Sequence, residues 1–256
     1  MRASKATCVP YDDKAEGTDF LHHAFAAWRN HRCVKISRPL AVRREGKASE
    51  NTRRLPADSR AEAARHMVME WADKTRPIVS FSHQCEEFRF RFNGANKYQE
   101  RAWLDGKFWE AEELDYLTAI LPPHPSVMDV GANVGNHAVY FDRFLAPSHL
   151  RLFEPHPDAV KILRDNLALN GVSSVDIEEV GVSKISGRGS LNIPKNKGHG
   201  AASLYENESG NIIVTTLDQW SDCAVDLVKI DVEGGELDVL RGGKTLLKTY
   251  RPHLLV

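Results

Sequence analysis

The sequence predicts an α/β protein built on a doubly wound parallel sheet, and three observations support this fold class. Short apolar segments such as "SVMDV" alternate with longer segments of helical periodicity over the second half of the chain. These short segments are largely apolar throughout, as expected for strands that are covered on both faces. The stretch "VMDVGANVGNH" (127–137) joins the first such strand to a helix through a turn with two glycines. Repeated strand–helix units of this kind form a parallel sheet between two helical layers.

Composition restricts the class of protein. The chain has 256 residues, of which 42% are apolar and 27% are charged, as in ordinary globular proteins. A formal net charge of −1 gives no global field that would attract nucleic acid or a membrane, and neither partner is expected. The four cysteines form no CxxC pair, and no metal-ligand group is recognisable. Because neither a membrane-length apolar stretch nor a signal-peptide core is present, a cytoplasmic location is expected.

Residues 1–75 differ from the remainder and are expected to form an N-terminal extension. They carry 15 Lys and Arg against 10 Asp and Glu. Helical periodicity predicts helices over 18–30 and 59–74, and the polar segment 43–54 is typical of a flexible basic linker. The sequence therefore predicts a partly helical extension at 1–75 and a second domain at 76–256.

The elements of the second domain follow from its periodicity. Residues 86–94 alternate like a strand with Phe88, Phe90 and Phe92 on one side, and residues 110–123 form a helix closed by two prolines. Apolar positions three and four residues apart predict the later helices, of which the second is stopped by Gly171. A hairpin insertion is expected between the third and fourth strands of the sheet. The predicted strands are 126–132, 150–155, 175–182, 225–233 and 253–256, and the helices between them are 135–145, 157–171 and 235–249.

The turn after the first strand has the spacing D-x-G-x-x-x-G, from Asp129 to Gly135. Gly131 and Gly135 allow a sharp turn and the close approach of a ligand. A dinucleotide site would need a further glycine where Asn133 stands, so a pyrophosphate is disfavoured. Asp129 is instead suited to a cationic amine. A turn that merely connects strand to helix is also compatible with this motif alone.

The end of the second strand carries an acid in the position of a ribose ligand. Glu154 follows Gly131 by 23 residues, and a carboxylate there can accept hydrogen bonds from both ribose hydroxyls. Standing alone before Pro155, it could also cap the next segment. An amine, a ribose and no phosphate together describe S-adenosylmethionine, whose adenine is expected near Gly181, Val182 and Ser183.

Four segments resemble the successive motifs of the FkbM-type S-adenosylmethionine-dependent methyltransferases: "VMDVGANVGNHAVYF", "LFEPHPDAVKILRDNLALNG", "VTTLDQW" and "VDLVKIDVEGGELDVLRGG". The resemblance covers roughly residues 86–256, and K-x-D-x-E-G-x-E is its most specific part. It implies a class I, Rossmann-like methyltransferase that acts on oxygen, in sugars or secondary metabolites. The expected cofactor-binding residues are Asp129, Gly131, Ala132, Asn133, Gly135, Asn136, Glu154, Pro155, Val182 and Asp231.

The predicted fourth strand carries the candidate catalytic residues. Strand alternation places Lys229, Asp231 and Glu233 on one face, where buried charges are costly without a purpose. Asp231 is the first candidate for a base that deprotonates an alcohol, and His199 is the second. Lys229 and Glu233 would orient Asp231 or the acceptor. An ion pair of Lys229 with Asp231 or Glu233 that only seals the strand end is the structural alternative.

The chain ends inside the predicted fifth strand, and the resemblance implies a domain that continues with one helix and two strands. A domain truncated in the fifth strand is therefore expected, with part of the substrate wall absent. The predicted function is O-methylation of a hydroxyl on a sugar or small metabolite by in-line displacement. A catalytically inactive binding or scaffolding protein is the alternative. A nucleic-acid methyltransferase is disfavoured by the near-neutral charge.

Overall fold

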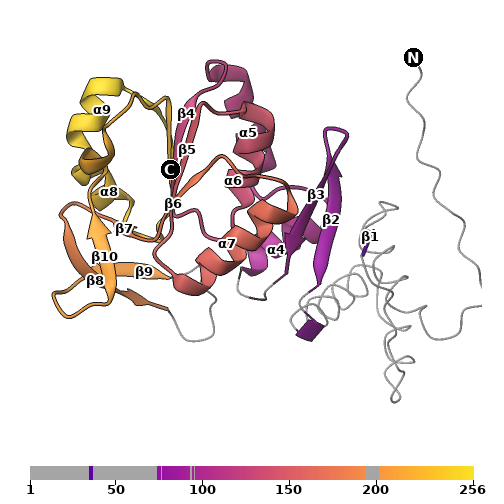
Figure 1. Ribbon diagram of the computed structural model, residues 1–256, viewed down its shortest axis with the longest axis horizontal. Helices are drawn as coiled ribbons and strands as arrows, with labels where there is room; N and C mark the ends of the chain where they lie inside the picture. The colour runs from indigo at the N-terminus through magenta and orange to yellow at the C-terminus, as the bar shows by residue number, and fades with distance from the viewer. Residues whose placement is uncertain (1–34, 37–73, 76, 93, 95, 194–201) are drawn as a thin grey trace, which may run out of the picture.

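The computed structural model describes residues 35–36, 74–75, 77–92, 94, 96–193 and 202–256 (Figure 1). The helix expected at 18–30, the linker at 43–54 and nearly all of the helix expected at 59–74 lie outside these residues. Within the described part of the chain, none of the helices combines the length and apolar character needed to cross a membrane.

A five-stranded parallel sheet forms the centre of the molecule and confirms the predicted fold class. The chain first moves outward from β4 through β5 to β6, and then returns to the other side of β4 for β11 and β12. Strand order therefore reverses between β4 and β11, where ligands bind in open α/β sheets. The sheet order is β12 (His253–Leu255), β11 (Leu227–Ile230), β4 (Ser126–Val130), β5 (His149–Phe153) and β6 (Asp176–Glu178).

Helices cover both faces of this sheet, as Figure 1 shows. On one face lie α6 (Asn136–Tyr140), its π-helical continuation η1 (Phe141–Leu145) and α7 (Pro157–Leu169). On the other lie α8 (Glu236–Gly242) and α9 (Lys244–Tyr250). Alternate strand residues supply two separate cores. Val127 and Leu227 pack in the first core, whereas Met128, Val228 and Ile230 pack in the second.

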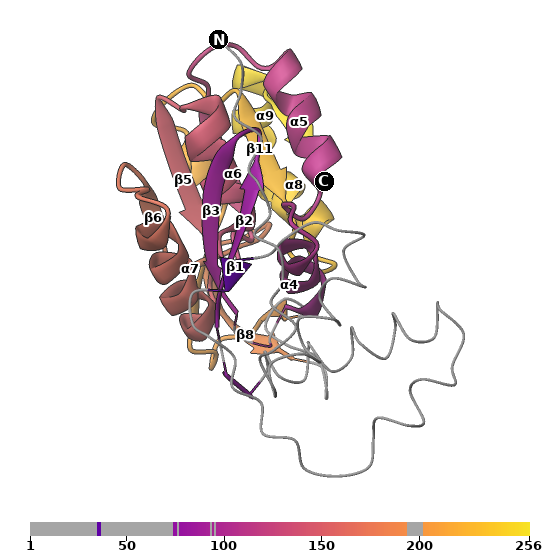
Figure 2. The ribbon, with the colours of Figure 1, turned by 90° about the vertical axis from the view of Figure 1, so that its right-hand side faces the viewer.

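An antiparallel hairpin and two helices precede the sheet. The strands β2 (Ile78–His83) and β3 (Glu86–Arg91) pair with each other, and β1 (Lys35–Ile36) pairs with β2. Backbone amides of β3 donate to Asn166 of α7 and to Asn170, which directly follows that helix, so the hairpin packs along α7 (Figure 1 and Figure 2). The helices are α4 (Lys97–Leu104) and α5 (Ala111–Ile120).

Aromatic side chains hold this N-terminal layer to the sheet. Phe88, Phe90 and Phe92 are fully buried, as the alternation of residues 86–94 predicts. Phe90 stacks on Trp103 of α4 with ring centroids 4.4 Å apart. The partner strand β2 was not predicted from the sequence. The turn that joins β2 to β3 contains Gln84 and Cys85, which adopt positive φ although neither is the glycine or asparagine that is typical of such turns.

A second sheet corrects the strand predicted at 175–182. That segment breaks into β6, which pairs with β5, and β7 (Gly181–Val182), which pairs with β10. A Cβ on Gly181 would lie 2.6 Å from Leu204, so this glycine permits the second sheet to pack closely. The insertion expected between the third and fourth strands is present, and β8 (Gly187–Asn192) pairs antiparallel with β10 (Ile212–Thr215), the pair expected from the sequence. A strand that the sequence did not predict, β9 (Ser203–Glu206), pairs with the other edge of β8, and the 3-10 helix η3 (Leu217–Trp220) follows β10.

Two further boundaries differ from the sequence prediction. The helix expected over 235–249 divides at Gly242 and Gly243, because Gly242 approaches the backbone of Ser183 so closely that a Cβ would lie 2.1 Å from its carbonyl oxygen. The strand expected over 225–233 ends at Ile230. Glu233 lies in a turn with φ of 57°, so strand alternation does not extend to it.

We expect Gly131→Ala to destabilise the fold far more than Gly171→Ala. Both glycines have positive φ, of 83° and 73°. A Cβ on Gly131 would lie 1.9 Å from the carbonyl oxygen of Asp231, whereas one on Gly171 would meet nothing within 4 Å. Gly171→Ala should cost about 1–2 kcal/mol for the left-handed backbone. Gly131→Ala should add about 1–3 kcal/mol of overpacking. Urea denaturation measures both, and equal losses would contradict the proposed close approach.

Candidate active site

A cleft lies at the carboxyl edge of the central sheet, at the reversal of strand order. Its walls come from the residues that follow β4, β5 and β11 and from the second sheet. Many residues predicted to bind a cofactor line it. These are Gly131, Asn133, Glu154, Pro155, Val182 and Asp231.

The glycines of the turn after β4 are required by packing within the protein. The backbone amides of Gly131 and Ala132 both donate to the carbonyl of Phe153, at 2.9 and 3.0 Å. Gly131 abuts the Asp231 backbone, and a Cβ on Gly135 would lie 2.7 Å from Leu163 of α7. These packing contacts are a further reason for glycine at both positions, beside the ligand approach that the sequence predicts.

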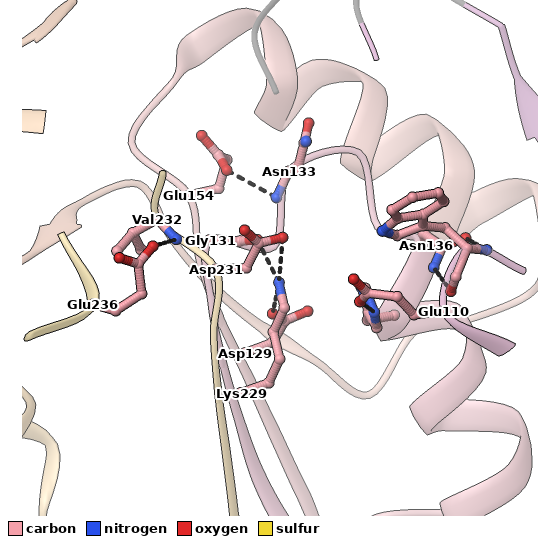
Figure 3. Close-up of polar contacts among 12 residues, drawn as sticks. Glu110, Asp129, Gly131, Asn133, Asn136, Glu154, Lys229, Asp231, Val232 and Glu236 are labelled. Carbon is pink, nitrogen blue, oxygen red and sulfur yellow. Dashed lines mark hydrogen bonds and ion pairs between the residues drawn. The ribbon is translucent and has the colours of Figure 1, made fainter. Parts of the chain in front are cut away.

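Glu154 is held at the end of β5 by two backbone amides. Its Oε2 accepts from the amide of Asn133 at 2.8 Å (Figure 3). Its Oε1 accepts from the amide of His156 at 2.8 Å. Burial raises the pKa of Glu154 to about 7, although these two hydrogen bonds and the charge of Lys229 oppose the shift. The carboxyl group is thus fixed in orientation at the wall of the cleft.

A buried ion pair joins β4 and β11 beneath the cleft. Lys229 and Asp129 are paired positions of these adjacent strands, and Lys229 Nζ lies 3.1 Å from Asp129 Oδ1. The same ammonium donates to the carbonyl of Gly131 at 2.9 Å and lies 3.7 Å from Asp231 Oδ2 (Figure 3). Burial opposes the charge of Lys229, but the carboxylates of Asp129 and Asp231 outweigh it and raise the lysine pKa.

This geometry changes the expected pairing of the charged residues. The sequence pairs Lys229 with Asp231 or Glu233, whereas the shorter contact is with Asp129, which the sequence assigns to a cofactor amine. Asp129 is fully buried, while the Asp231 side chain is 48% exposed. Asp231 is therefore the member of this cluster that faces the cleft.

Asn136 and His137, at the start of α6, contact the segment before α5. Asn136 is fully buried and accepts from the indole of Trp103 at 2.9 Å and from the Trp109 amide at 3.1 Å. His137 Nε2 lies 2.9 Å from Glu110 Oε2. Glu110 was not among the sequence candidates, because it belongs to no motif and its strand-end neighbours are distant in the chain.

The second sheet supplies the outer wall of the cleft. Gly181, Val182 and Ser183 line it, at the positions where the sequence expects adenine. Leu191, Ala202 and Leu204 face them from β8, the segment before β9, and β9 itself. The sequence placed the insertion near the site but named none of these apolar residues, because its register depends on the pairing of β8 with β9 and β10.

The remaining residues that the sequence singles out lie partly inside and partly outside the cleft. Ala132 and Gly135 lie outside the cleft lining, and Glu233 lies within it. Glu236, at the start of α8, accepts from the amides of Val232 and Gly234 and so caps this turn. His199 lies outside the described residues. Among the residues that the structure describes, no group of three or more His, Cys, Asp or Glu side chains is placed to hold a metal ion.

The Methyltransferase FkbM domain model matches residues 129–256, which is half of the chain. The chain belongs to the FkbM methyltransferase family. The match begins at Asp129 and includes the turn after β4, Glu154, the second sheet and β11. The methyl donor of the FkbM domain is S-adenosylmethionine, as the sequence predicts.

Curated relatives of the FkbM domain include two methyltransferases. The 2-O-methyltransferase NoeI of Sinorhizobium fredii (strain NBRC 101917 / NGR234) is 33% identical over 152 residues, which cover 50% of this chain and 61% of NoeI. Methyltransferase sdnD of Sordaria araneosa is 30% identical over 164 residues, covering 50% and 63%. The chain thus spans about six tenths of the length of these relatives.

Among solved structures, an rRNA methylase from Streptococcus thermophilus superposes with a TM-score of 0.36 and 14% identity. The match covers 54% of this chain and 63% of that chain.

The residues of the cleft fit S-adenosylmethionine. The carboxyl group of Glu154 keeps lone pairs for ribose hydroxyls after accepting two backbone hydrogen bonds. The wall of Val182, Leu191 and Leu204 is apolar, as a nucleobase requires. The half-exposed Asp231 carboxylate supplies negative charge at the same edge, which suits a sulfonium cation.

Removing the buried ammonium should be costly. We expect Lys229→Met to lower the free energy of unfolding by about 3–5 kcal/mol, because Asp129 is then buried without its partner. Replacing both residues, as in Lys229→Met with Asp129→Leu, should restore much of this loss. Asp231→Asn, at a half-exposed site, should cost under about 1 kcal/mol. Denaturant titrations check all three, and a small effect of Lys229→Met would disprove the importance of the pair.

Glu154 should make stability depend on pH. Its pKa is about 7 in the folded protein and 4.5 as the ordinary value, so the folded state keeps a proton that the unfolded state releases. The free energy of unfolding should therefore fall as pH rises from 4.5 to 7, by about 3 kcal/mol in total. Glu154→Gln should lack this component. Unfolding curves at several pH values test it, and identical slopes in both proteins would contradict it.

Proposed function

We propose that the chain is an S-adenosylmethionine-dependent O-methyltransferase that acts on a hydroxyl of a sugar or small metabolite. The observation that carries this proposal is the placement of Asp231. Its half-exposed carboxylate lines the same cleft as Glu154 and stands beside the buried ammonium of Lys229. The name of the relative NoeI, a 2-O-methyltransferase, also favours oxygen as the acceptor atom.

The cofactor, when bound, supplies a methyl group that its sulfonium already activates, so the chain mainly has to align the reactants. Glu154 would bind the ribose, and the apolar wall of Val182 and Leu204 would hold the adenine. These contacts leave the acceptor side of the cleft to residues around Asp231. Alignment of this kind lowers the activation barrier, because the entropy cost of bringing the reacting atoms together is met when the ligands bind.

Asp231 is proposed to accept the hydroxyl proton as the new carbon–oxygen bond forms. Its backbone is fixed, since its amide donates to the carbonyl of Val130 at 2.9 Å. The buried Lys229 would keep the carboxylate oriented from below and is a positioning residue, because its ammonium is committed to Asp129 and Gly131. Glu233 lines the cleft and is a candidate for acceptor contact.

Two measurements on the purified, folded chain test this proposal. Calorimetric titration with S-adenosylhomocysteine should show binding that weakens roughly tenfold to a hundredfold in Glu154→Ala, because the hydrogen bonds between its carboxyl group and the ribose are lost. Glu179→Ala is the matched control, because this exposed glutamate pairs with Arg164 outside the cleft. Transfer from labelled S-adenosylmethionine to sugars and hydroxylated metabolites should fall about a hundredfold or more in Asp231→Asn.

Each result separates the proposal from its rival. A folded chain that binds no S-adenosylhomocysteine would contradict the cofactor site. Binding without transfer to any hydroxylated acceptor would favour a non-catalytic binding or scaffolding protein. Transfer that is undiminished in Asp231→Asn would remove this residue from the proposed chemistry.

A further inference from the structure

The carboxylate that the sequence assigns to the cofactor amine is already occupied. Asp129 is fully buried, and the Lys229 ammonium lies 3.1 Å from it. That ammonium also donates to the Gly131 carbonyl at 2.9 Å. Because Asp129 is fully buried and its charge is already paired with Lys229, a more exposed acid near the end of β4 is better placed to meet the amine.

Glu110 is such an acid, and its backbone is unusual. It precedes α5 with φ of 58° and ψ of 38°, in the left-handed region that disfavours residues other than glycine. Its side chain makes no capping hydrogen bond to α5. Instead, Oε2 contacts His137 Nε2 at 2.9 Å, and the Glu110 side chain stays 36% exposed while His137 is 2% exposed. Unfavourable backbone geometry that serves no helix cap is typical of functional sites.

The surrounding charges keep Glu110 ionised. The hydrogen bond from His137 lowers the pKa of Glu110, against the opposing effect of burial, and the charge of Lys229 lowers it further. The ammonium of Lys229 thus interacts with three carboxylates, those of Asp129, Asp231 and Glu110. Together these four residues have more negative than positive charge, which is complementary to a cationic ligand, and Asp231 is the member that lines the cleft.

Glu110 also lies in the right direction from the adenosine pocket. Figure 3 shows Glu154 and Glu110 on opposite sides of the cluster formed by Gly131, Asp231 and Lys229. Adenine at Val182 and ribose at Glu154 would occupy one end of the cleft. A ligand that continues past Gly131 and Asp231 would bring its other end toward Glu110. In S-adenosylmethionine that end is the amino acid, which carries an ammonium group.

We propose that Glu110 binds the ammonium of the methionine end of S-adenosylmethionine, with His137 holding the carboxylate in position. This inference rests on the cofactor site of the proposed function. It places a cofactor ligand in the segment before β4, outside the part of the chain that the family model matches.

The test compares two ligands that differ at this end. S-adenosylhomocysteine carries the amino acid, whereas 5′-deoxy-5′-methylthioadenosine has the same adenosine and sulfur but ends in a methyl group. Calorimetry on the chain with Glu110→Gln should show roughly tenfold to hundredfold weaker binding of S-adenosylhomocysteine and unchanged binding of the thioadenosine. Glu112→Gln, at an exposed position in the first turn of α5, is the matched control and should bind both ligands normally.

The outcomes are distinct. Unchanged binding of S-adenosylhomocysteine in Glu110→Gln would overturn the inference while leaving the proposed function intact. Equal weakening of both ligands would also overturn it, because Glu110 would then support the fold of the site rather than bind the amine. If the unaltered chain bound neither ligand, the result would contradict the proposed cofactor site, and this inference would be contradicted with it.

Discussion

The ion pair of Lys229 with Asp129 is the interaction on which the site depends. It joins β4 to β11 at the reversal of strand order, and the Lys229 ammonium reaches on to the carbonyl of Gly131. The two strand ends that border the cleft are therefore tied through one buried cation. Such pairs contribute little net stability compared with apolar packing, but the loss of one partner is severe. The register of these strands places Lys229 opposite Asp129, and Asp231 directly follows β11.

Around this pair, the polar residues divide into those that hold the protein together and those that face the cleft. Asn136 joins α6 to the segment before α5, and Glu236 caps the turn before α8. Glu154 combines both tasks, because backbone amides fix its two oxygens while it lines the cleft. A carboxyl group held in this manner needs no rearrangement to accept ribose hydroxyls, which favours binding.

Much of the site could be predicted because its residues follow strands with clear apolar patterns. Gly131, Asn133, Glu154 and Asp231 all line the cleft. The contact of Gly131 with the Asp231 backbone had no local signal, because it exists only once β11 lies beside β4. Glu110 had no local signal, because its importance comes from His137 and Lys229, which lie on other elements.

The sequence by itself determined the order of strands and helices in the central parallel sheet and the family, because these depend on local periodicity and on short motifs. Tertiary structure decided which charges meet. Strand alternation grouped Lys229 with Asp231 and Glu233, but parallel pairing gave Lys229 a closer partner in Asp129. Cross-strand neighbours such as Lys229 and Asp129 are distant in the chain. A buried charge is costly unless an opposite charge lies beside it, which favours this pairing. The reversal of strand order brought them together at one edge of the sheet.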